Sequence, residues 1–205
     1  GPANPVAIVD ETADLAKAAK DISDGASFDN NIMCISEKCI VAVESIVPAF
    51  VKQLEENGVY YIDNETEMLQ LTKTVLNHDM KMVRKMEGKS AMDILEEAGI
   101  HPNRPVRLVV VRTFAKHPLV LEECLMPVVP LVAVADFEEA LETALFTEQG
   151  YRHTAMVHSQ CIDRLSKAAK IMNTTVFIKN GSSLAGIGLN GEEMASFTIA
   201  NVTGE

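Results

Sequence analysis

Short apolar runs alternate along this chain with segments whose apolar residues recur every three or four positions. Residues 6–9 form the first run, and a segment with helical spacing follows from Leu15 to an expected end at Gly25. A short apolar run followed by an amphipathic helix is typical of parallel strands joined by crossover helices. The alternation therefore predicts an α/β fold, with a mostly parallel sheet and crossover helices on both faces.

The same alternation continues through most of the chain. Further strands are expected at residues 40–43, 60–62, 107–112, 128–134, 154–157, 175–178 and 196–199. Capping boxes, Asn64 with Glu67 and Asp136 with Glu139, mark two of the intervening helices. Residues 78–106 are the least regular part, where only residues 90–99 predict a helix. We therefore expect residues 1–205 to form one domain without a linker or an internal repeat.

Composition and charge exclude several classes of protein. The net charge of −11 repels phosphate backbones, so we expect no nucleic-acid partner. No apolar run approaches the roughly 20 residues that span a bilayer, and residues 1–5 lack the features of a signal peptide. We therefore expect no membrane association and a cytoplasmic location. The cysteines are widely scattered, which predicts free thiols: Cys34, Cys39, Cys124 and Cys161.

Two candidate motifs lack the context that their chemistry needs. Residues 186–191 match G-x-G-x-x-G, but no strand directly precedes them and no helix directly follows. We interpret them as a glycine-rich loop. His153 and His158 would point to opposite faces of a strand, and no cluster of cysteines or carboxylates accompanies them. We therefore expect no metal site.

The segment around Cys34 is the most informative for function. Residues 27–38 read SFDNNIMCISEK, so the cysteine follows Asn30 and Asn31 at a junction between a helix and a strand. We take such a junction as an active-site position in an α/β fold. A thiol there can face a cleft beside backbone N–H groups that hold an oxyanion, whereas a core cysteine is buried and inert. Spacing alone leaves both interpretations open.

Residues 27–38 resemble the S-F-D-N-N-x-x-C-x-x-E-K signature of the CoA-acylating branch of the aldehyde dehydrogenase superfamily. This branch contains the propionaldehyde and acetaldehyde dehydrogenases of propanediol and ethanolamine utilisation. Residues 4–14 resemble the strand that enters the thiol domain of the family, and residues 122–127 resemble its E-E-x-x-x-P segment. Residues 152–159 are similar to the H-T-A…H-S stretch of the branch. The resemblance extends along essentially the whole chain.

The resemblance implies roles for four residues. Cys34 would be the nucleophile, Glu123 would hold the nicotinamide ribose with Leu125 beside it, and His153 would handle the proton of the incoming CoA thiol. The cofactor would be NAD, the co-substrate coenzyme A and the substrate a short-chain aldehyde. The parent enzyme would be a homo-oligomer in the cytoplasm or in the lumen of a bacterial microcompartment.

The family carries its nucleotide-binding fold upstream of the segment that opens this chain. We therefore expect residues 1–205 to be the catalytic thiol domain, without the nucleotide-binding and oligomerisation parts and inactive in isolation. Two alternatives stay open. One is a cysteine hydrolase or amidase that uses Cys34 and His153, and the other is a non-catalytic α/β interaction domain in which Cys34 is packed.

Overall fold

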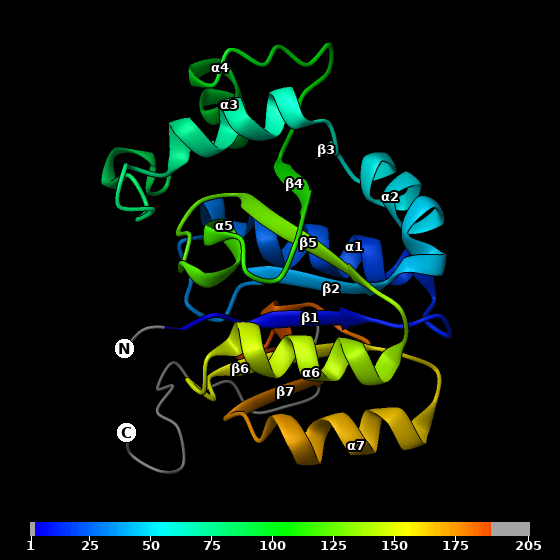
Figure 1. Cartoon of the computed structure of the whole chain (residues 1–205). Coiled ribbons are helices and arrows are strands. Elements are labelled where there is room, and N and C mark those ends of the chain that lie inside the picture. The colour runs from blue at the N-terminus through cyan, green and yellow to red at the C-terminus, as the bar shows by residue number, and fades with distance from the viewer. Residues whose placement is uncertain (1–2, 190–205) are drawn as a thin grey trace.

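A computed structural model describes residues 3–189. Within them seven parallel strands form one sheet in the order β3-β4-β5-β2-β1-β6-β7 (Figure 1). The strands are β1 (Val6–Val9), β2 (Cys39–Val43), β3 (Val59–Ile62), β4 (Leu108–Thr113), β5 (Val128–Val134), β6 (Thr154–His158) and β7 (Val176–Lys179). The α-helices are α1 (Leu15–Ser27), α2 (Val47–Glu56), α3 (Glu65–Val75), α4 (Ala91–Glu97), α5 (Pro118–Leu121), α6 (Phe137–Glu148) and α7 (Ile162–Met172). The 3-10 turns are η1 (Phe28–Asn31), η2 (Glu44–Ile46), η3 (Arg84–Met86) and η4 (Ser183–Ile187).

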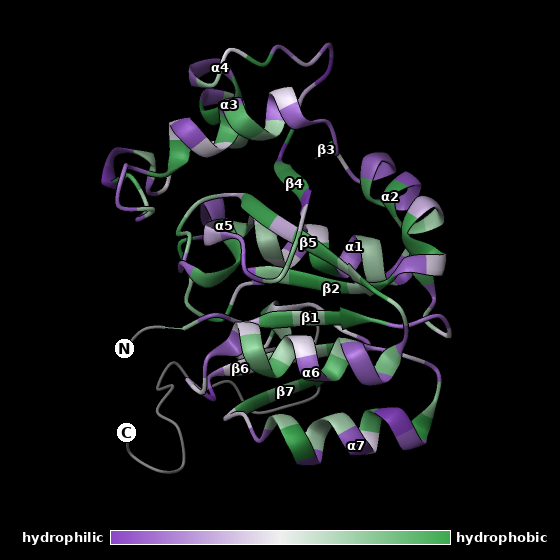
Figure 2. Ribbon diagram, in the orientation of Figure 1, coloured by the Kyte–Doolittle hydropathy of each residue, from purple (hydrophilic) through white to green (hydrophobic). Residues whose placement is uncertain are grey.

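Helices cover both faces of the sheet, which confirms the predicted fold class. Helices α1 and α2 pack on one face, and α3 to α7 pack on the other. Successive residues of β4 point to opposite faces of the sheet. Val110 packs in the core cluster of α1 and α2, and Val109 packs in the core cluster of α3 and α4. The inner strands β1, β2 and β5 are largely apolar along their length, as Figure 2 shows, because both of their faces are buried.

Several local predictions are confirmed and one is wrong. Asn64 and Asp136 cap α3 and α6, each accepting a hydrogen bond from the backbone N–H three residues on. Helix α1, however, continues through Gly25 to Ser27. Gly25 is buried against another part of the chain and does not end the helix. The strand predicted at residues 196–199 and the final glycine of the glycine-rich loop lie outside the described residues.

The parallel strands place distant segments of the chain at one edge of the sheet. Every residue that immediately precedes a strand lies at the same end of the strands, which we call the amino edge. Lys38 precedes β2, Pro127 precedes β5 and His153 precedes β6, so these segments meet there. The candidate site is built on this edge.

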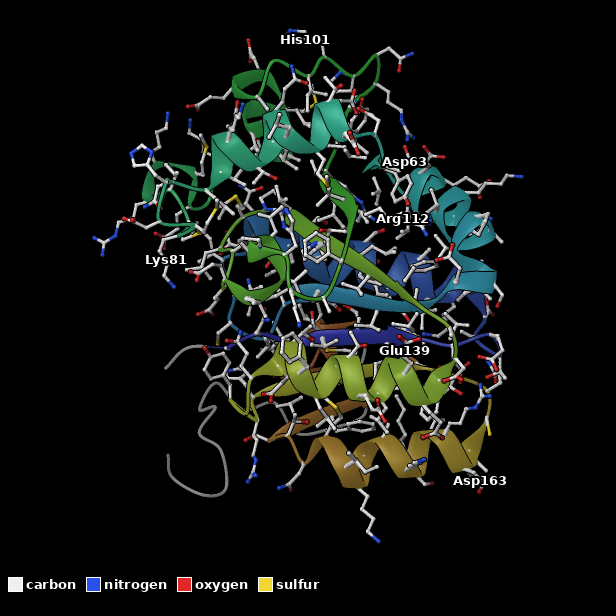
Figure 3. All side chains as sticks on the ribbon, in the orientation of Figure 1. Asp63, Lys81, His101, Arg112, Glu139 and Asp163 are labelled. Carbon is white, nitrogen blue, oxygen red and sulfur yellow. The ribbon has the colours of Figure 1, made fainter. Side chains whose placement is uncertain are left out.

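Many polar and charged side chains lie at the periphery of the molecule. Figure 3 shows Lys81, His101 and Asp163 far from the sheet, and His101 and Lys81 are exposed. Within residues 3–189 no helix is both long enough and apolar enough to cross a membrane.

Candidate active site

Cys34 lies on a turn between η1 and β2 and is exposed. Cys39 and Cys124 are buried, and burial raises the pKa of each thiol to about 12. Cys161 is partly exposed and directly precedes α7. The interpretation of Cys34 as a packed core residue is therefore wrong, and Cys34 is the thiol open to solvent at the amino edge.

A left-handed turn leads the chain to Cys34. Asp29, Asn30 and Asn31 have φ values of 47°, 51° and 62°. Asn and Asp adopt this region more readily than other residues with a side chain, but three in succession are unusual, and such strain tends to collect at functional sites. A turn beside the two amides was predicted from the sequence, but its left-handed conformation was not, although three adjacent Asx residues were a signal for it.

Gly88 joins this turn to the segment that contains Glu123 and Leu125. Its carbonyl accepts a hydrogen bond from Asn30 Nδ2 at 2.9 Å, and its N–H donates to the carbonyl of Leu125 at 2.9 Å. Gly88 has a φ of +70°, and a Cβ there would lie 2.8 Å from Ile32 Cδ1. Glycine at this position therefore avoids the backbone strain that a residue with a side chain would have. The irregular segment 78–106 thus links two parts of the site that are far apart in sequence.

Lys38, a residue that the sequence did not single out, lies within electrostatic range of Cys34, Glu123 and His153. Burial lowers the pKa of Lys38 to about 8, and the charges of Glu123 and Cys34 act against that shift. Burial also lowers the pKa of His153, and the Lys38 charge adds to the effect. His153 is half-buried, and its Nδ1 lies 2.9 Å from Thr154 Oγ1. Its imidazole is therefore neutral at pH 7 and able to accept a proton.

Glu37 is a second buried charge that the sequence analysis missed. One carboxylate oxygen accepts the N–H of Ser183 at 2.9 Å, and the other accepts the Ser183 hydroxyl at 2.7 Å. Burial raises the pKa of the Glu37 carboxyl to about 7, and the bonds from Ser183 offset part of the rise. A Glu-Lys pair normally lies in solvent, so only the tertiary contacts of η4 and Asn31 reveal that Glu37 and Lys38 are buried.

We expect Glu37→Gln to stabilise the chain in a pH-dependent way. The folded chain holds the Glu37 proton up to about pH 7, whereas the unfolded chain loses it near pH 4.5, so stability falls as the pH rises between these values. The amide can keep both bonds to Ser183 without a buried charge. The gain in unfolding free energy should be about 3 kcal/mol at pH 8 and under about 1 kcal/mol at pH 5, measured by urea denaturation.

Glu138→Gln is the matched control, because Glu138 is exposed on α6. It should change the stability little at either pH. An equal effect of Glu37→Gln at pH 5 and pH 8 would contradict the assignment of a raised carboxyl pKa.

The candidate site lies at the opposite edge from the one where α/β sheets usually bind ligands. Cys34 precedes its strand, whereas ligand crevices form beyond the carboxyl ends of strands. At the carboxyl ends of β1 and β6, Asp10 accepts hydrogen bonds from the hydroxyls of Thr12 and Ser159, both at 2.6 Å. The rule that ligands bind beyond the carboxyl ends of parallel strands therefore does not explain the position of Cys34.

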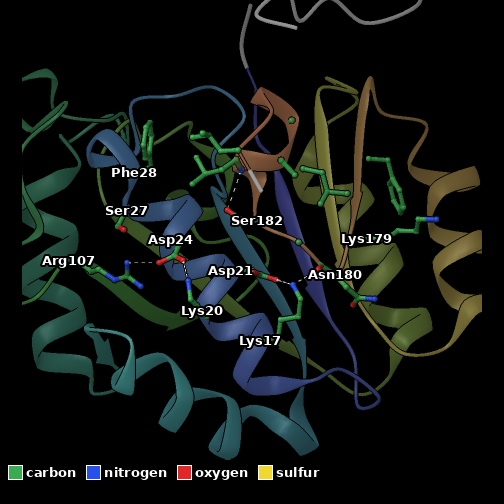
Figure 4. Close-up of a pocket in the computed structure, with 17 residues that line it drawn as sticks. Lys17, Lys20, Asp21, Asp24, Ser27, Phe28, Arg107, Lys179, Asn180 and Ser182 are labelled. Carbon is green, nitrogen blue, oxygen red and sulfur yellow. Dashed lines mark hydrogen bonds and ion pairs between the residues drawn. The ribbon is translucent and has the colours of Figure 1, made fainter. Parts of the chain in front are cut away.

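A hollow of about 800 Å³, whose lining does not include Cys34, lies between α1 and the segment from β7 to η4 (Figure 4). Several of its charged groups are paired with one another. Lys17 pairs with Asp21 at 2.5 Å, and Arg107 pairs with Asp24 at 2.7 Å. Gly186 lines this hollow within η4, so residues 186–189 do not follow a strand directly, as a dinucleotide site requires. Within residues 3–189 no group of three His, Cys, Asp or Glu side chains could hold a metal ion.

The chain is similar to several known proteins along its whole length. The chain is 45% identical to a propanal dehydrogenase (CoA-propanoylating) from Salmonella typhimurium, over all of this chain and 44% of that protein. A propionaldehyde dehydrogenase from Rhodopseudomonas palustris, solved with bound CoA and an acylated cysteine, is 41% identical, with a TM-score of 0.95 over all of this chain and 47% of that one. A propionaldehyde dehydrogenase from a Clostridium phytofermentans microcompartment for fucose utilisation is 39% identical, with a TM-score of 0.94 and the same coverage.

This chain thus spans less than half the length of these relatives. The model of the aldehyde dehydrogenase family matches residues 1–189. That match covers most of the 205 residues, including the turn of Cys34 and the segments of Glu123 and His153. The chain therefore belongs to the aldehyde dehydrogenase family.

Proposed function

We propose that this chain is the catalytic domain of an NAD-dependent, CoA-acylating aldehyde dehydrogenase, which converts a short-chain aldehyde and CoA to an acyl-CoA. The observation that carries the proposal is the exposed thiol of Cys34 on a left-handed turn, with Glu123 and His153 near the same buried lysine. The acylated cysteine in the description of the R. palustris relative supports a covalent role for Cys34.

Cys34 carries the covalent steps in this proposal. Its thiolate adds to the aldehyde carbonyl to form a thiohemiacetal. The N–H of Cys34 donates to no carbonyl within residues 3–189, so it is available to hold the oxyanion. A bound nicotinamide would accept the hydride that leaves the thiohemiacetal, and a thioester would remain on Cys34. The CoA thiol then attacks the thioester, and its acyl group leaves Cys34.

His153 is the proposed acceptor of the CoA thiol proton. Its neutral imidazole suits this role at pH 7. In separate structures of the C. phytofermentans enzyme, a cysteine and a histidine were each replaced by alanine. Those two positions are separated by nearly the same number of residues as Cys34 and His153, which supports pairing them in one site.

Most of the NAD site lies outside this chain in our proposal. Glu123 is a partly buried carboxylate that could hold the nicotinamide ribose, and Leu125 lies beside it. The glycine-rich loop does not supply a dinucleotide fold. We assign the nucleotide-binding and oligomerisation parts of a homo-oligomeric parent to sequence outside residues 1–205. The microcompartment origin of one relative supports a place in the cytoplasm or in such a lumen.

A cysteine hydrolase is the less favoured function. Such an enzyme needs a base within hydrogen-bond reach of its thiol. Among residues 3–189 no hydrogen bond joins Cys34 to His153, whose Nδ1 is paired with Thr154. Glu37, the acid nearest to Cys34 in sequence, is fully buried, and both of its carboxylate oxygens are bonded to Ser183, so it is not placed to activate water beside Cys34.

The acyl acceptor tests the proposal. In a protein that joins this chain to the nucleotide-binding part of its family, propanal and NAD should acylate Cys34. We expect acyl-CoA to replace free acid as the CoA concentration rises, because a thiol attacks a thioester with little help and water needs a positioned base. Free acid as the main product at saturating CoA would instead place the protein with the hydrolytic aldehyde dehydrogenases.

A further inference from the structure

Lys38 is a lysine buried at the amino edge of the sheet. Its side chain is only 2% exposed, although lysines are almost never buried without a partner. Its Nζ donates hydrogen bonds to both oxygens of one residue, the main-chain oxygen of Asn31 at 2.5 Å and the side-chain Oδ1. A buried ammonium with two bonds to a single residue restrains the position of that residue.

Asn31 closes the loop that carries Cys34. It is the last left-handed residue of the turn, and its Nδ2 donates to the carbonyl of Ala26 at 2.8 Å and to that of Glu37 at 3.0 Å. These bonds join the end of α1 to the segment before β2, and Lys38 adds a third attachment. Cys34 lies between the two ends of this loop, so its placement depends on these bonds.

The groups that face Lys38 come from every segment of the candidate site. They are Glu37 beside it, Cys34 on the turn, Glu123 and Cys124 before β5, and His153 before β6. The carboxylates and thiols oppose the loss of the Lys38 proton, and the histidine is neutral. A buried cation among them attracts an approaching anion, because charges interact more strongly where water is scarce.

We infer that Lys38 is a positioning residue for Cys34: its buried ammonium, bound to both oxygens of Asn31, holds the left-handed turn and supplies positive charge beside the reacting thiolate. The inference rests on the proposed function only in taking Cys34 as the reacting thiol. Burial lowers the pKa of Lys38 to about 8. Above that pH the neutral amine keeps two N–H donors for the two Asn31 oxygens, so the charge is lost before the hydrogen bonds.

Two alkylating reagents distinguish the effect of the Lys38 charge from its structural effect on the turn. Iodoacetate is an anion and iodoacetamide is neutral, but both react with the same thiolate, so the ratio of their rate constants does not depend on the amount of thiolate. At Cys34 this ratio should fall by roughly three- to ten-fold as the pH rises through about 8, because Lys38 stops attracting the anion. Peptide mass spectrometry reads the rate constants at Cys34 alone.

Three variants show which residue causes the change in this ratio. Lys38→Met should show the low ratio already at pH 7. Glu37→Gln identifies any part of the change that comes from Glu37, whose carboxyl pKa burial raises to about 7. Lys167→Met is the matched control, because it removes one exposed lysine, the partner of Glu138 on α6, and should behave as the wild type.

The pH dependence of the rate ratio in the wild-type chain tests the inference even if Lys38→Met does not fold. A constant ratio from about pH 6 to pH 10 would overturn the inference. Equal slowing of both reagents in Lys38→Met, without a change in their ratio, would also overturn it, because that is the result of a merely structural role. Neither reagent involves an aldehyde, NAD or CoA, so this result stands apart from the test of the acyl acceptor.

Discussion

Replacing Cys34 with alanine is expected to abolish acyl transfer in a protein that joins this chain to a nucleotide-binding part. The loss should be roughly 10⁴-fold or more, because every covalent step of the proposed reaction takes place on this sulfur. In the isolated chain the same variant should lose its fastest iodoacetamide adduct. Timed labelling read by peptide mass spectrometry measures this adduct for each of the four cysteines.

The other thiols supply the controls. Cys39 and Cys124 are buried, and with a thiol pKa of about 12 only roughly 1 in 10,000 of each is ionised at pH 8. Cys161 is partly exposed, so Cys161→Ala should leave both acyl transfer and the labelling of Cys34 unchanged. Modification of Cys39 or Cys161 as fast as Cys34 would contradict the assignment.

Replacing Gly25 with alanine should have the largest effect on stability. The added Cβ would lie 2.2 Å from one carboxylate oxygen of Glu37 and 2.5 Å from the hydroxyl of Ser183. Glu37 is fully buried and bonded to Ser183, so it has no free space to move into. We expect a loss of about 3 kcal/mol or more in the free energy of unfolding, measured by urea denaturation.

Gly150→Ala distinguishes this close contact from ordinary glycine strain. Gly150 has a φ of +80° and nothing within 4 Å of its added Cβ, so alanine there should cost only about 1 kcal/mol. Gly25 has no such left-handed backbone, and its loss would come from the contact with Glu37 alone. Similar losses of unfolding free energy in the two variants would contradict this, because they would show that the Glu37 side chain moves away from the added Cβ at little cost.

The sequence determined the architecture because its signals are local. Apolar runs of strand length and helices with one apolar face can be buried together only in a layered α/β sheet, and the cap at Asn64 depends on residues three positions apart. The signature around Cys34 also lies within one short segment, so it could be read without the fold. The end of α1 was misplaced at Gly25 because a glycine near the end of a helical pattern usually marks its cap.

Only the tertiary structure decided the environment of Cys34. Parallel pairing brings the segments before β2, β5 and β6 to one edge, so Glu123 and His153 approach a cysteine far from them in sequence. Burial then changes the chemistry of Glu37 and Lys38, which a sequence shows only as an ordinary surface ion pair. The physical reason is that desolvation depends on which segments pack together, and the order of residues along the chain does not reveal that packing.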